Sequence, residues 1–284
     1  MKAVLELSKP RITQLVVLTA AGGYYMAARA PFALGRFGWT LLGTALVAAG
    51  TNALNQIRER DTDALMRRTR GRPLPSGRIT PRRALAFATA AATVGIGLLA
   101  WRVNLLTAAL AALTLVSYVW VYTSLKPRTS YNTLVGAVPG ALPVLGGWTA
   151  AGGELSAPAW ALFWILFLWQ LPHFLALAWI YRDDYRSAGL AMLSIDDADG
   201  SRTARMTLLY AVALVPVSLV PTVLGLTGPV YFWGVLGLGL VYAAAGAAMV
   251  WRPAARSLWA RRVFLVSIVY LPALLTLGVV DKTG

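Results

Sequence analysis

The sequence predicts an all-α polytopic membrane protein with nine transmembrane helices, and two observations support that prediction. Hydrophobic residues make up 58% of the 284 positions and charged residues 13%, whereas soluble domains average about 45–50% apolar and about 25% charged residues. The apolar residues also cluster into stretches close to the roughly 20 residues that a helix needs to cross the hydrocarbon core. These stretches cover almost the whole chain, so we expect a single transmembrane domain over residues 1–284.

Nine apolar stretches are expected to form the membrane helices, at about 12–28, 38–57, 84–100, 105–123, 133–150, 159–180, 206–224, 230–250 and 263–280. The first could be taken for a secretory signal, but it is longer than a typical signal core and Glu6 weakens the basic leader. We therefore expect it to be retained. In the fifth stretch, Gly136 and Gly140, together with Pro139 and Pro143, predict close helix packing with a kink.

The basic residues predict which helix ends face the cytoplasm. With the N-terminus inside, almost all Lys and Arg residues fall on the inner side, and the outer side receives only Arg29, Arg36, Arg102 and Lys282. This positive-inside bias predicts a protein of the cell membrane with its N-terminus and both long loops in the cytoplasm and its C-terminus outside. The net charge of +15 then reflects topology and anionic lipids. Nucleic-acid binding would need a basic soluble face, and none is expected.

The most informative cluster is Asn55, Glu59 and Asp63 at the inner end of the second helix. Steps of four residues keep side chains on one stripe of a helix, and acids at a membrane imply a functional role by default. Two carboxylates and an amide are the hard oxygen ligands that Mg²⁺ favours together with substrate phosphate. Several arginines that suit phosphate follow in the next loop: Arg67, Arg68, Arg70 and Arg72. The cluster predicts a metal-assisted reaction on a phosphorylated substrate.

A second acidic cluster, Asp183 and Asp184, follows the sixth helix, which contains the single histidine, His173. Eleven residues separate His173 from Asp184, so we expect them to share one face of a continuous helix. Two acidic clusters that face one cavity would hold two or more Mg²⁺ ions against a diphosphate leaving group. His173 is either a structural core residue or a group that ligates an iron or orients an acceptor substrate.

The remaining acids and one further basic loop have simpler interpretations. Asp61 points away from the Asn55 stripe and is expected to pair with a nearby arginine. Solvation is expected for Asp196, Asp197 and Asp199. Lys126 and Arg128, in a third inner loop, could also reach a phosphate. The chain has no cysteine, which excludes disulfides, thiolate catalysis and thiolate-bound clusters.

These motifs, taken together, resemble the UbiA-type intramembrane prenyltransferases, and in particular the branch that acts on haem. The first acidic motif runs from Asn55 through Glu59 and Asp63 to Met66-Arg67-Arg68-Thr69-Arg70-Gly71-Arg72-Pro73-Leu74, with Glu59 where the family usually has Asp. The likeness spans about residues 9–193 and includes Lys9-Pro10-Arg11-Ile12-Thr13, Lys126-Pro127-Arg128-Thr129, Pro172-His173-Phe174 and Arg182-Asp183-Asp184-Tyr185.

The resemblance implies nine helices around a central cavity and transfer of a farnesyl group from farnesyl diphosphate to a vinyl group of haem B. Mg²⁺ would assist loss of diphosphate, and water would complete the hydroxyethylfarnesyl product, haem O. It also suggests contacts with other proteins of the haem A pathway or of oxidase assembly. The metal and diphosphate residues it implies are Asn55, Glu59, Asp63, Asp183 and Asp184; Arg67, Arg72, Lys126 and Arg128 would assist with phosphate, and His173 and Tyr185 would bind substrate.

Three alternatives stay open at this point. The chain could be a UbiA-type prenyltransferase that acts on an aromatic quinone precursor or a chlorophyll-type ring, although His173 and the Arg182–Tyr185 motif speak against it. It could be a transporter that binds a cation or couples protons, yet transporters place such charges near the midplane, whereas these acids cluster at one face. A non-enzymatic assembly factor would leave both acidic clusters unexplained.

Overall fold

The computed structural model describes residues 2–283, and the two ends of the expected domain, Met1 and Gly284, lie outside the described residues. Every named element in that range is helical, which confirms the all-α prediction. The elements are α1 (Lys2–Leu7), α2 (Pro10–Ala27), α3 (Leu34–Arg58), α4 (Arg60–Leu65), α5 (Pro81–Arg102), α6 (Leu105–Val116), the π-helical turn η1 (Ser117–Tyr122), α7 (Thr123–Leu125), α8 (Asn132–Ala150), α9 (Ala157–Ile180), α10 (Arg182–Ser187), α11 (Ser201–Val223), α12 (Pro229–Trp251), the 3₁₀ turn η2 (Pro253–Ala255) and α13 (Arg256–Val280).

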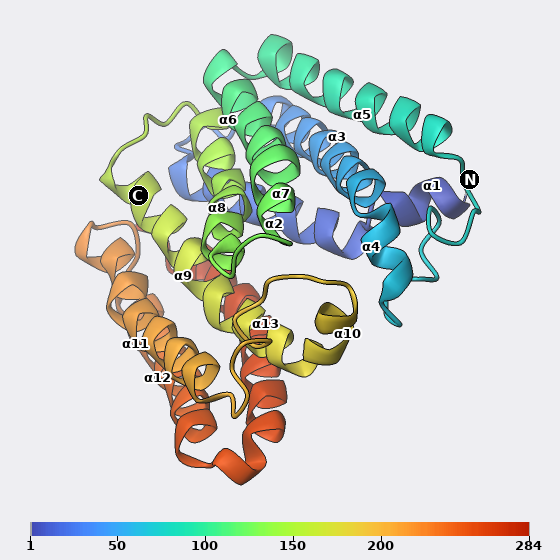
Figure 1. Ribbon diagram of the computed structural model, residues 1–284. Coiled ribbons are helices and arrows are strands. Elements are labelled where there is room, and N and C mark those ends of the chain that lie inside the picture. The colour runs from blue at the N-terminus through green and yellow to red at the C-terminus, as the bar shows by residue number, and fades with distance from the viewer. Residues whose placement is uncertain (1, 284) are drawn as a thin grey trace.

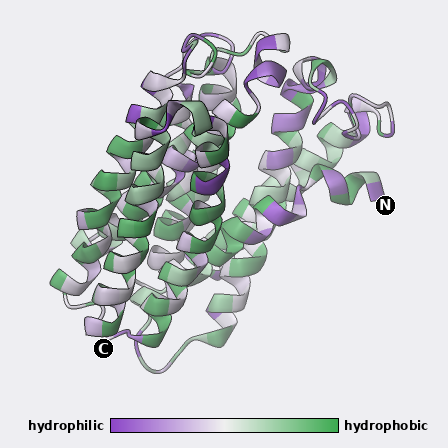
Figure 2. Cartoon of the chain, turned by 90° about the horizontal axis from the view of Figure 1, so that it is seen from below, coloured by the Kyte–Doolittle hydropathy of each residue, from purple (hydrophilic) through white to green (hydrophobic). Residues whose placement is uncertain are grey.

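Long helices stand at all nine of the expected positions. Among the described residues, eight of them are long and apolar enough to cross a membrane; α2, with 18 residues, is the ninth long helix but is not one of those eight. Apolar residues cover the shafts of the helices, and hydrophilic segments gather at the end of the bundle opposite the C-terminus (upper part of Figure 2). The multiple apolar helices make this an integral membrane protein.

The helices pack mainly as neighbouring pairs around the interior of the bundle (Figure 1). Helix α3 packs along α5, α2 along α8, and α9 lies against α8, α11 and α13, while α11 and α12 pair at the opposite edge from α5. The largest group of buried hydrophobic side chains comes from α8, α9 and α11 to α13. The C-terminal helices therefore form the main core, and a mainly apolar cavity lies on the other side of α8 and α9.

Small residues let these helices approach closely. A Cβ atom at Gly147 of α8 would overlap the Ala20 carbonyl of α2, and one at Gly23 of α2 would overlap the Val144 carbonyl of α8. Within a bilayer, packing and hydrogen bonds drive helix association more than the hydrophobic effect does. A Cβ at Gly140 would likewise overlap the side chain of Gln170 on α9, which confirms the predicted close packing of this segment.

Two of the expected continuous helices are interrupted, which corrects the sequence interpretation. Helix α3 ends at Arg58, with Glu59 as a non-helical junction (φ −94°, ψ 7°) before α4. Helix α9 ends at Ile180, before α10. His173 and Asp184 therefore do not share one face of a single helix. Both breaks occur where the chain leaves the apolar region, so helical periodicity cannot be extended across them.

Asp197 is buried, not solvated as expected. The residue is only 3% exposed. Its Oδ2 accepts a hydrogen bond from the backbone N–H of Thr203 (2.7 Å), and its Oδ1 accepts one from the backbone N–H of Arg202 (3.3 Å). The first N–H groups of a helix lack partners within it, so Asp197 satisfies the start of α11. Asp196 and Asp199 are exposed, as expected.

Candidate active site

Two cavities of different character meet inside the bundle. The larger one, about 330 Å³, is mainly apolar and is lined by residues of α2, α3, α6, α8 and α9, among them Val16, Val47, Leu110, Leu166 and Trp169. The smaller one, about 140 Å³, is polar and lies at the C-terminal ends of α3 and α7, with Asn55, Glu59, Asp63, Arg72 and Lys126 in its wall. Tyr118 lines both cavities. An amphiphilic molecule could therefore place its polar end in one cavity and its apolar part in the other.

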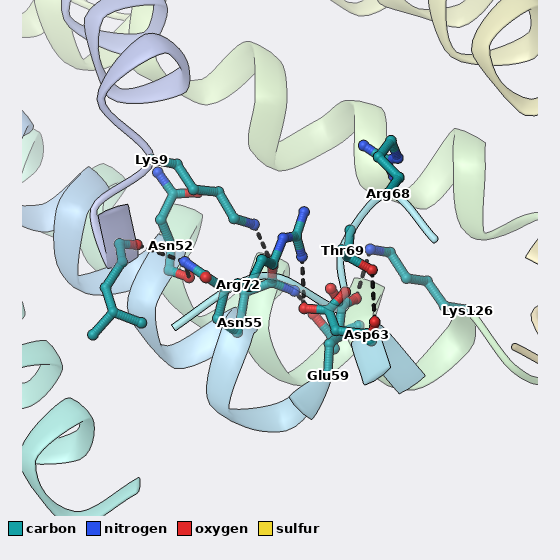
Figure 3. Close-up of polar contacts among 12 residues, drawn as sticks. Lys9, Asn52, Asn55, Glu59, Asp63, Arg68, Thr69, Arg72 and Lys126 are labelled. Atoms are coloured by element: carbon teal, nitrogen blue, oxygen red, sulfur yellow. Dashed lines mark hydrogen bonds and ion pairs between the residues drawn. The ribbon is translucent and has the colours of Figure 1, made fainter. Parts of the chain in front are cut away.

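The first acidic cluster lines the polar cavity in spite of the break after α3. The backbone N–H of Glu59 still donates to the Asn55 carbonyl (2.9 Å), and that of Asp63 donates to the Glu59 carbonyl (2.7 Å). These bonds preserve the spacing of one helical turn, so the three side chains remain neighbours (Figure 3). The sequence prediction was correct about their proximity and wrong about a single helix.

Three basic side chains face the three side chains of this cluster, and each forms one short contact (Figure 3). Lys126 Nζ lies 2.6 Å from Glu59 Oε1, Arg72 Nη1 lies 2.6 Å from Asp63 Oδ2, and Lys9 Nζ donates to Asn55 Oδ1 at 2.9 Å. These three residues come from three separate loops: Lys9 precedes α2, Arg72 follows α4 and Lys126 follows α7. The cavity wall thus combines anionic and cationic groups, the requirement for a site that holds metal ions and phosphate together.

Burial controls the protonation of this cluster. For Glu59, burial alone would raise the pKa, but the Lys126 ammonium and then Lys9 outweigh it and hold the pKa below its usual value. For Lys126, burial is outweighed by the Glu59 carboxylate, which keeps the pKa well above normal. Burial, reinforced by nearby Arg72, lowers the pKa of Lys9 to about 7. Glu59 and Lys126 are therefore a charged pair at neutral pH.

Asp63 supplies an unsatisfied acceptor inside the cavity wall. The residue is 0% exposed, and its Oδ1 has no hydrogen-bond partner among the described residues, while Oδ2 is held by Arg72. A buried acceptor left unpaired costs about 1–3 kcal/mol. The oxygen ligands of Asn55, Glu59 and Asp63 fit a hard divalent cation such as Mg²⁺, and a bound cation would satisfy the orphaned atom.

The second acidic cluster lies beside this cavity but does not line it. Asp184 Oδ2 accepts a hydrogen bond from the backbone N–H of Arg68 (3.3 Å), whereas Asp183 is exposed and lies 3.4 Å from Arg186. Within residues 2–283 no three His, Asp or Glu side chains lie close enough to hold a metal ion by themselves. A cation here needs further ligands from a substrate, and Mg²⁺ commonly takes phosphate oxygens and water in this way.

The other expected site residues divide into two groups. Tyr185 lines the polar cavity, where its hydroxyl lies 3.5 Å from an Arg68 guanidinium nitrogen. Arg67 and Arg128 are exposed and are not among the residues that line either cavity. Asp61 pairs with the neighbouring Arg60 at 3.1 Å, as expected.

Lys9 and Tyr118 are candidate functional residues that were not assigned a role from the sequence. Lys9 has a left-handed backbone (φ 45°, ψ 68°), a conformation that costs a non-glycine residue about 1–2 kcal/mol. Such strained residues cluster at functional sites. Its place in the Lys9-Pro10 motif was a usable signal, but nothing in the sequence shows that it contacts Asn55, 46 positions away.

Tyr118 lies in the π-helical turn η1, between α6 and α7, and this turn sets its position. Thr123 Oγ1 donates to the Tyr118 carbonyl (2.9 Å) and accepts a hydrogen bond from Asn55 Nδ2 (3.2 Å). The Tyr118 and Tyr122 ring centroids lie 5.1 Å apart. Single π-helical turns occur often at functional sites, and this one joins the two cavities to the acidic cluster.

His173 lines the apolar cavity, away from the acids. Its Nδ1 lies 2.7 Å from Ser267 Oγ of α13. The imidazole stacks on Trp169, with ring centroids 5.7 Å apart and an interplanar angle of 28°. The ring is therefore fixed from two sides, by α9 itself and by α13.

Comparison with known proteins places this arrangement among prenyltransferases. The sequence model of the UbiA prenyltransferase family matches residues 16–268. A protoheme IX farnesyltransferase of Solibacter usitatus (strain Ellin6076) is 45% identical over 296 residues, which cover 100% of both chains. A protoheme IX farnesyltransferase of Anaeromyxobacter sp. (strain Fw109-5) is 48% identical over 274 residues, 96% of this chain and 91% of the relative.

Solved structures share the fold at much lower identity. The structure of a digeranylgeranylglyceryl phosphate synthase aligns with a TM-score of 0.82 at 18% identity and covers 99% of this chain and 97% of that one. A UbiA homologue from Archaeoglobus fulgidus, bound to GPP and Mg²⁺, aligns with a TM-score of 0.67 at 16% identity and covers 98% and 99% of the two chains. These similarities show that the fold is that of the UbiA homologues.

Proposed function

The chain belongs to the UbiA prenyltransferase family, and from that premise we propose that it transfers a farnesyl group from farnesyl diphosphate to a vinyl group of haem B, giving haem O. Relatives that match its full length are named for farnesyl transfer to protoheme IX, which is haem B. The observation that carries the proposal is the junction of a polar and an apolar cavity at Tyr118. A prenyl diphosphate has the matching shape, with a charged head and a hydrocarbon tail.

The polar cavity is the site for the diphosphate. Arg72 and Lys126 provide the cationic contacts, with Lys9 as a third, and Tyr185 also lines this cavity. Mg²⁺, when bound, would be held by Asn55, Glu59 and Asp63 in the cavity wall, and it would neutralise charge on the diphosphate oxygens. The second acidic cluster, Asp183 and Asp184, lies beside the cavity and would reach the cation through water or substrate oxygens. The Mg²⁺-bound UbiA homologue supports divalent metal use in this fold. Arg67 and Arg128, both exposed, have no part in the proposed site.

The reaction starts at the bond between the first farnesyl carbon and the diphosphate oxygen. As that bond breaks, its electron pair leaves with the diphosphate, and the cationic side chains of the polar cavity stabilise the charge on the leaving group. The allylic cation that remains lies at the Tyr118 ring, where an aromatic face attracts positive charge. The terminal vinyl carbon of haem B bonds to the farnesyl carbon, and water adds to the neighbouring carbon and releases a proton.

The apolar cavity excludes competing reactions. Its lining contains no carboxylate, lysine or arginine, so it holds the isoprenoid chain by packing alone and keeps bulk water away from the cation. Premature hydrolysis would otherwise release farnesol. His173 also lies in this lining and is the proposed contact for the acceptor.

A mass-resolved assay with purified protein, farnesyl diphosphate and haem B, with and without Mg²⁺, tests the function. We expect a Mg²⁺-dependent haem product that is heavier by one farnesyl group and one hydroxyl group. If diphosphate is released only with an aromatic quinone precursor as the acceptor, the acceptor assignment is wrong. If farnesyl diphosphate is neither bound nor cleaved, the whole proposal fails and the transporter alternative gains weight.

The location of the reaction follows from the topology. We place the protein in the cell membrane with its polar cavity on the cytoplasmic side, because the basic residues concentrate there. The whole chain, residues 1–284, acts as one catalytic domain. Association with other proteins of the haem A pathway or of oxidase assembly remains a prediction, to be checked by crosslinking in cells followed by mass spectrometry.

A further inference from the structure

The surroundings of His173 are more specific than a structural core residue needs. Its ring lies between Trp169 and Phe264, with ring centroids 5.7 Å and 4.8 Å away. Ser267 of α13, which is 0% exposed, contacts Nδ1. The indole N–H of Trp169 donates to the Ser267 carbonyl at 2.8 Å, and the Tyr242 hydroxyl donates to the Trp169 carbonyl at 3.2 Å. Helices α9 and α13 thus contact the imidazole directly, and α12 holds the neighbouring Trp169.

The hydrogen bonds of Ser267 determine where the proton of His173 resides. Ser267 Oγ lies 2.5 Å from the Phe264 carbonyl oxygen. A carbonyl oxygen can only accept, and a serine hydroxyl has one hydrogen to donate, so that hydrogen points to Phe264. Ser267 Oγ must then accept the bond that joins it to His173 Nδ1 at 2.7 Å. The imidazole therefore carries its proton on Nδ1.

The second ring nitrogen is left free. Nε2 makes no hydrogen bond to the residues that the structure describes, and the side chain remains partly accessible in the apolar cavity wall. An imidazolium with an unpaired N–H in such a lining would be costly. His173 therefore presents a neutral imidazole whose Nε2 lone pair is available to a ligand.

We propose that Ser267 is a positioning residue that holds His173 with Nε2 directed to the iron of the haem acceptor. The inference deepens the proposed function and rests on it. A hydrocarbon tail has no atom that can bond to the imidazole nitrogen, whereas neutral histidine is the commonest protein ligand for metals. The cavity lining offers no other charged or imidazole side chain, so the iron–nitrogen bond is the strongest directional contact that it can provide.

Ser267 contributes to this bond without touching the acceptor. When a metal-binding histidine donates its other N–H to an oxygen, its tautomer and ring orientation are fixed and its basicity rises. Loss of such a partner typically weakens metal binding about 10–100-fold. An iron held at His173 would limit rotation of the porphyrin within the cavity that Tyr118 also lines.

Titration of the purified protein with haem B, without farnesyl diphosphate, tests the inference by absorption and electron paramagnetic resonance spectra. We expect a histidine-ligated spectrum for the unchanged protein, its loss in His173→Gly, and its return when imidazole is added to that variant. Ser267→Ala should weaken haem binding about 10–100-fold, and Ser267→Thr, which keeps the hydroxyl, should restore it. Ser218→Ala, which removes a buried α11 hydroxyl bonded to Tyr270 of α13, should leave the spectrum unchanged.

The outcomes separate the inference from the proposed function. If the His173→Gly spectrum matches that of the unchanged protein, the iron ligand is another group and the inference is overturned, even if farnesylated haem is still produced. If Ser267→Ala binds haem with unchanged affinity and spectrum, the positioning role is overturned. A histidine-ligated haem that is never farnesylated would support the iron site and contradict the transfer reaction.

Discussion

The carboxylate of Asp63 uses one oxygen to bind Arg72, and its other oxygen is buried without a partner. Asp63→Asn keeps the shape of the side chain but removes the charge that a divalent cation requires. We expect turnover to fall at least about 100-fold, the scale on which a lost electrostatic contact to a transition state acts. Steady-state rates at saturating Mg²⁺ provide the measurement. Asp61→Asn, at an exposed side chain two residues away, is the matched control and should be nearly as active as the unchanged protein.

Tyr118 is the residue that the two cavities share, so its ring should act on the reacting carbon. Replacement by Leu keeps the bulk and removes the aromatic face, so we expect kcat to fall about tenfold with little change in KM, within the range of a cation–π contact. Tyr118→Phe keeps the ring and should retain most of the rate. A Tyr118→Leu variant with raised KM and unchanged kcat would mean that the residue only binds the substrate.

For single residues, the sequence correctly predicts which side chains are neighbours where they are separated by one helical turn. Asn55, Glu59 and Asp63 were correctly placed together because they are four residues apart, and intrachain turns preserve that spacing. The contacts of Lys9 with Asn55 and of Lys126 with Glu59 span 46 and 67 residues, and only the packing of helices creates them. No local pattern could have paired them.

The helix that carries the acidic cluster is held in place through glycines. Gly95 of α5 lies where a Cβ would come within 2.8 Å of the Gly43 carbonyl and Val47 of α3, whereas a Cβ at Gly97 would have no neighbour within 4 Å. Gly95→Val should lower stability by about 1–3 kcal/mol through overpacking and reduce activity, because a displaced α3 moves Asn55. Thermal unfolding in detergent measures the first effect. Gly97→Val is the matched control, and equal losses in both variants would contradict this packing explanation.

The elements most accurately predicted were those with long apolar stretches, since the bilayer sets their length and composition. The differences from expectation are confined to short segments at helix ends. They are the break at Glu59, the start of α10 and the burial of Asp197 before α11. These local features depend on which unpaired backbone N–H and C=O groups at a helix end form hydrogen bonds with loop residues. The π-helical turn η1 also has no signal in hydropathy, because it differs from α-helix by one hydrogen-bond step.

For the whole molecule, the sequence does not show that the N-terminal and C-terminal halves have different structural roles. The motifs recognised in the sequence end at about residue 193, whereas the family match continues to residue 268. Beyond those motifs, α13 supplies Ser267 to the imidazole of His173, and α11 to α13 complete the largest core. The N-terminal helices instead surround the two cavities. The C-terminal core can therefore hold the acceptor through His173 while the acidic cluster binds the donor.

The orientation of the molecule in the membrane can be tested directly. Because the chain contains no cysteine, a single introduced cysteine reports which side of the membrane its position faces. Ser76 precedes α5 and Asp196 precedes α11, both exposed at the end predicted to be cytoplasmic, and Glu154 is exposed between α8 and α9 at the other end. In intact cells a membrane-impermeant maleimide should label Glu154→Cys only. Ser76→Cys and Asp196→Cys should react after the membrane is permeabilised. Labelling of Ser76→Cys in intact cells would reverse the topology and place the diphosphate site outside, where the positive-inside bias opposes it.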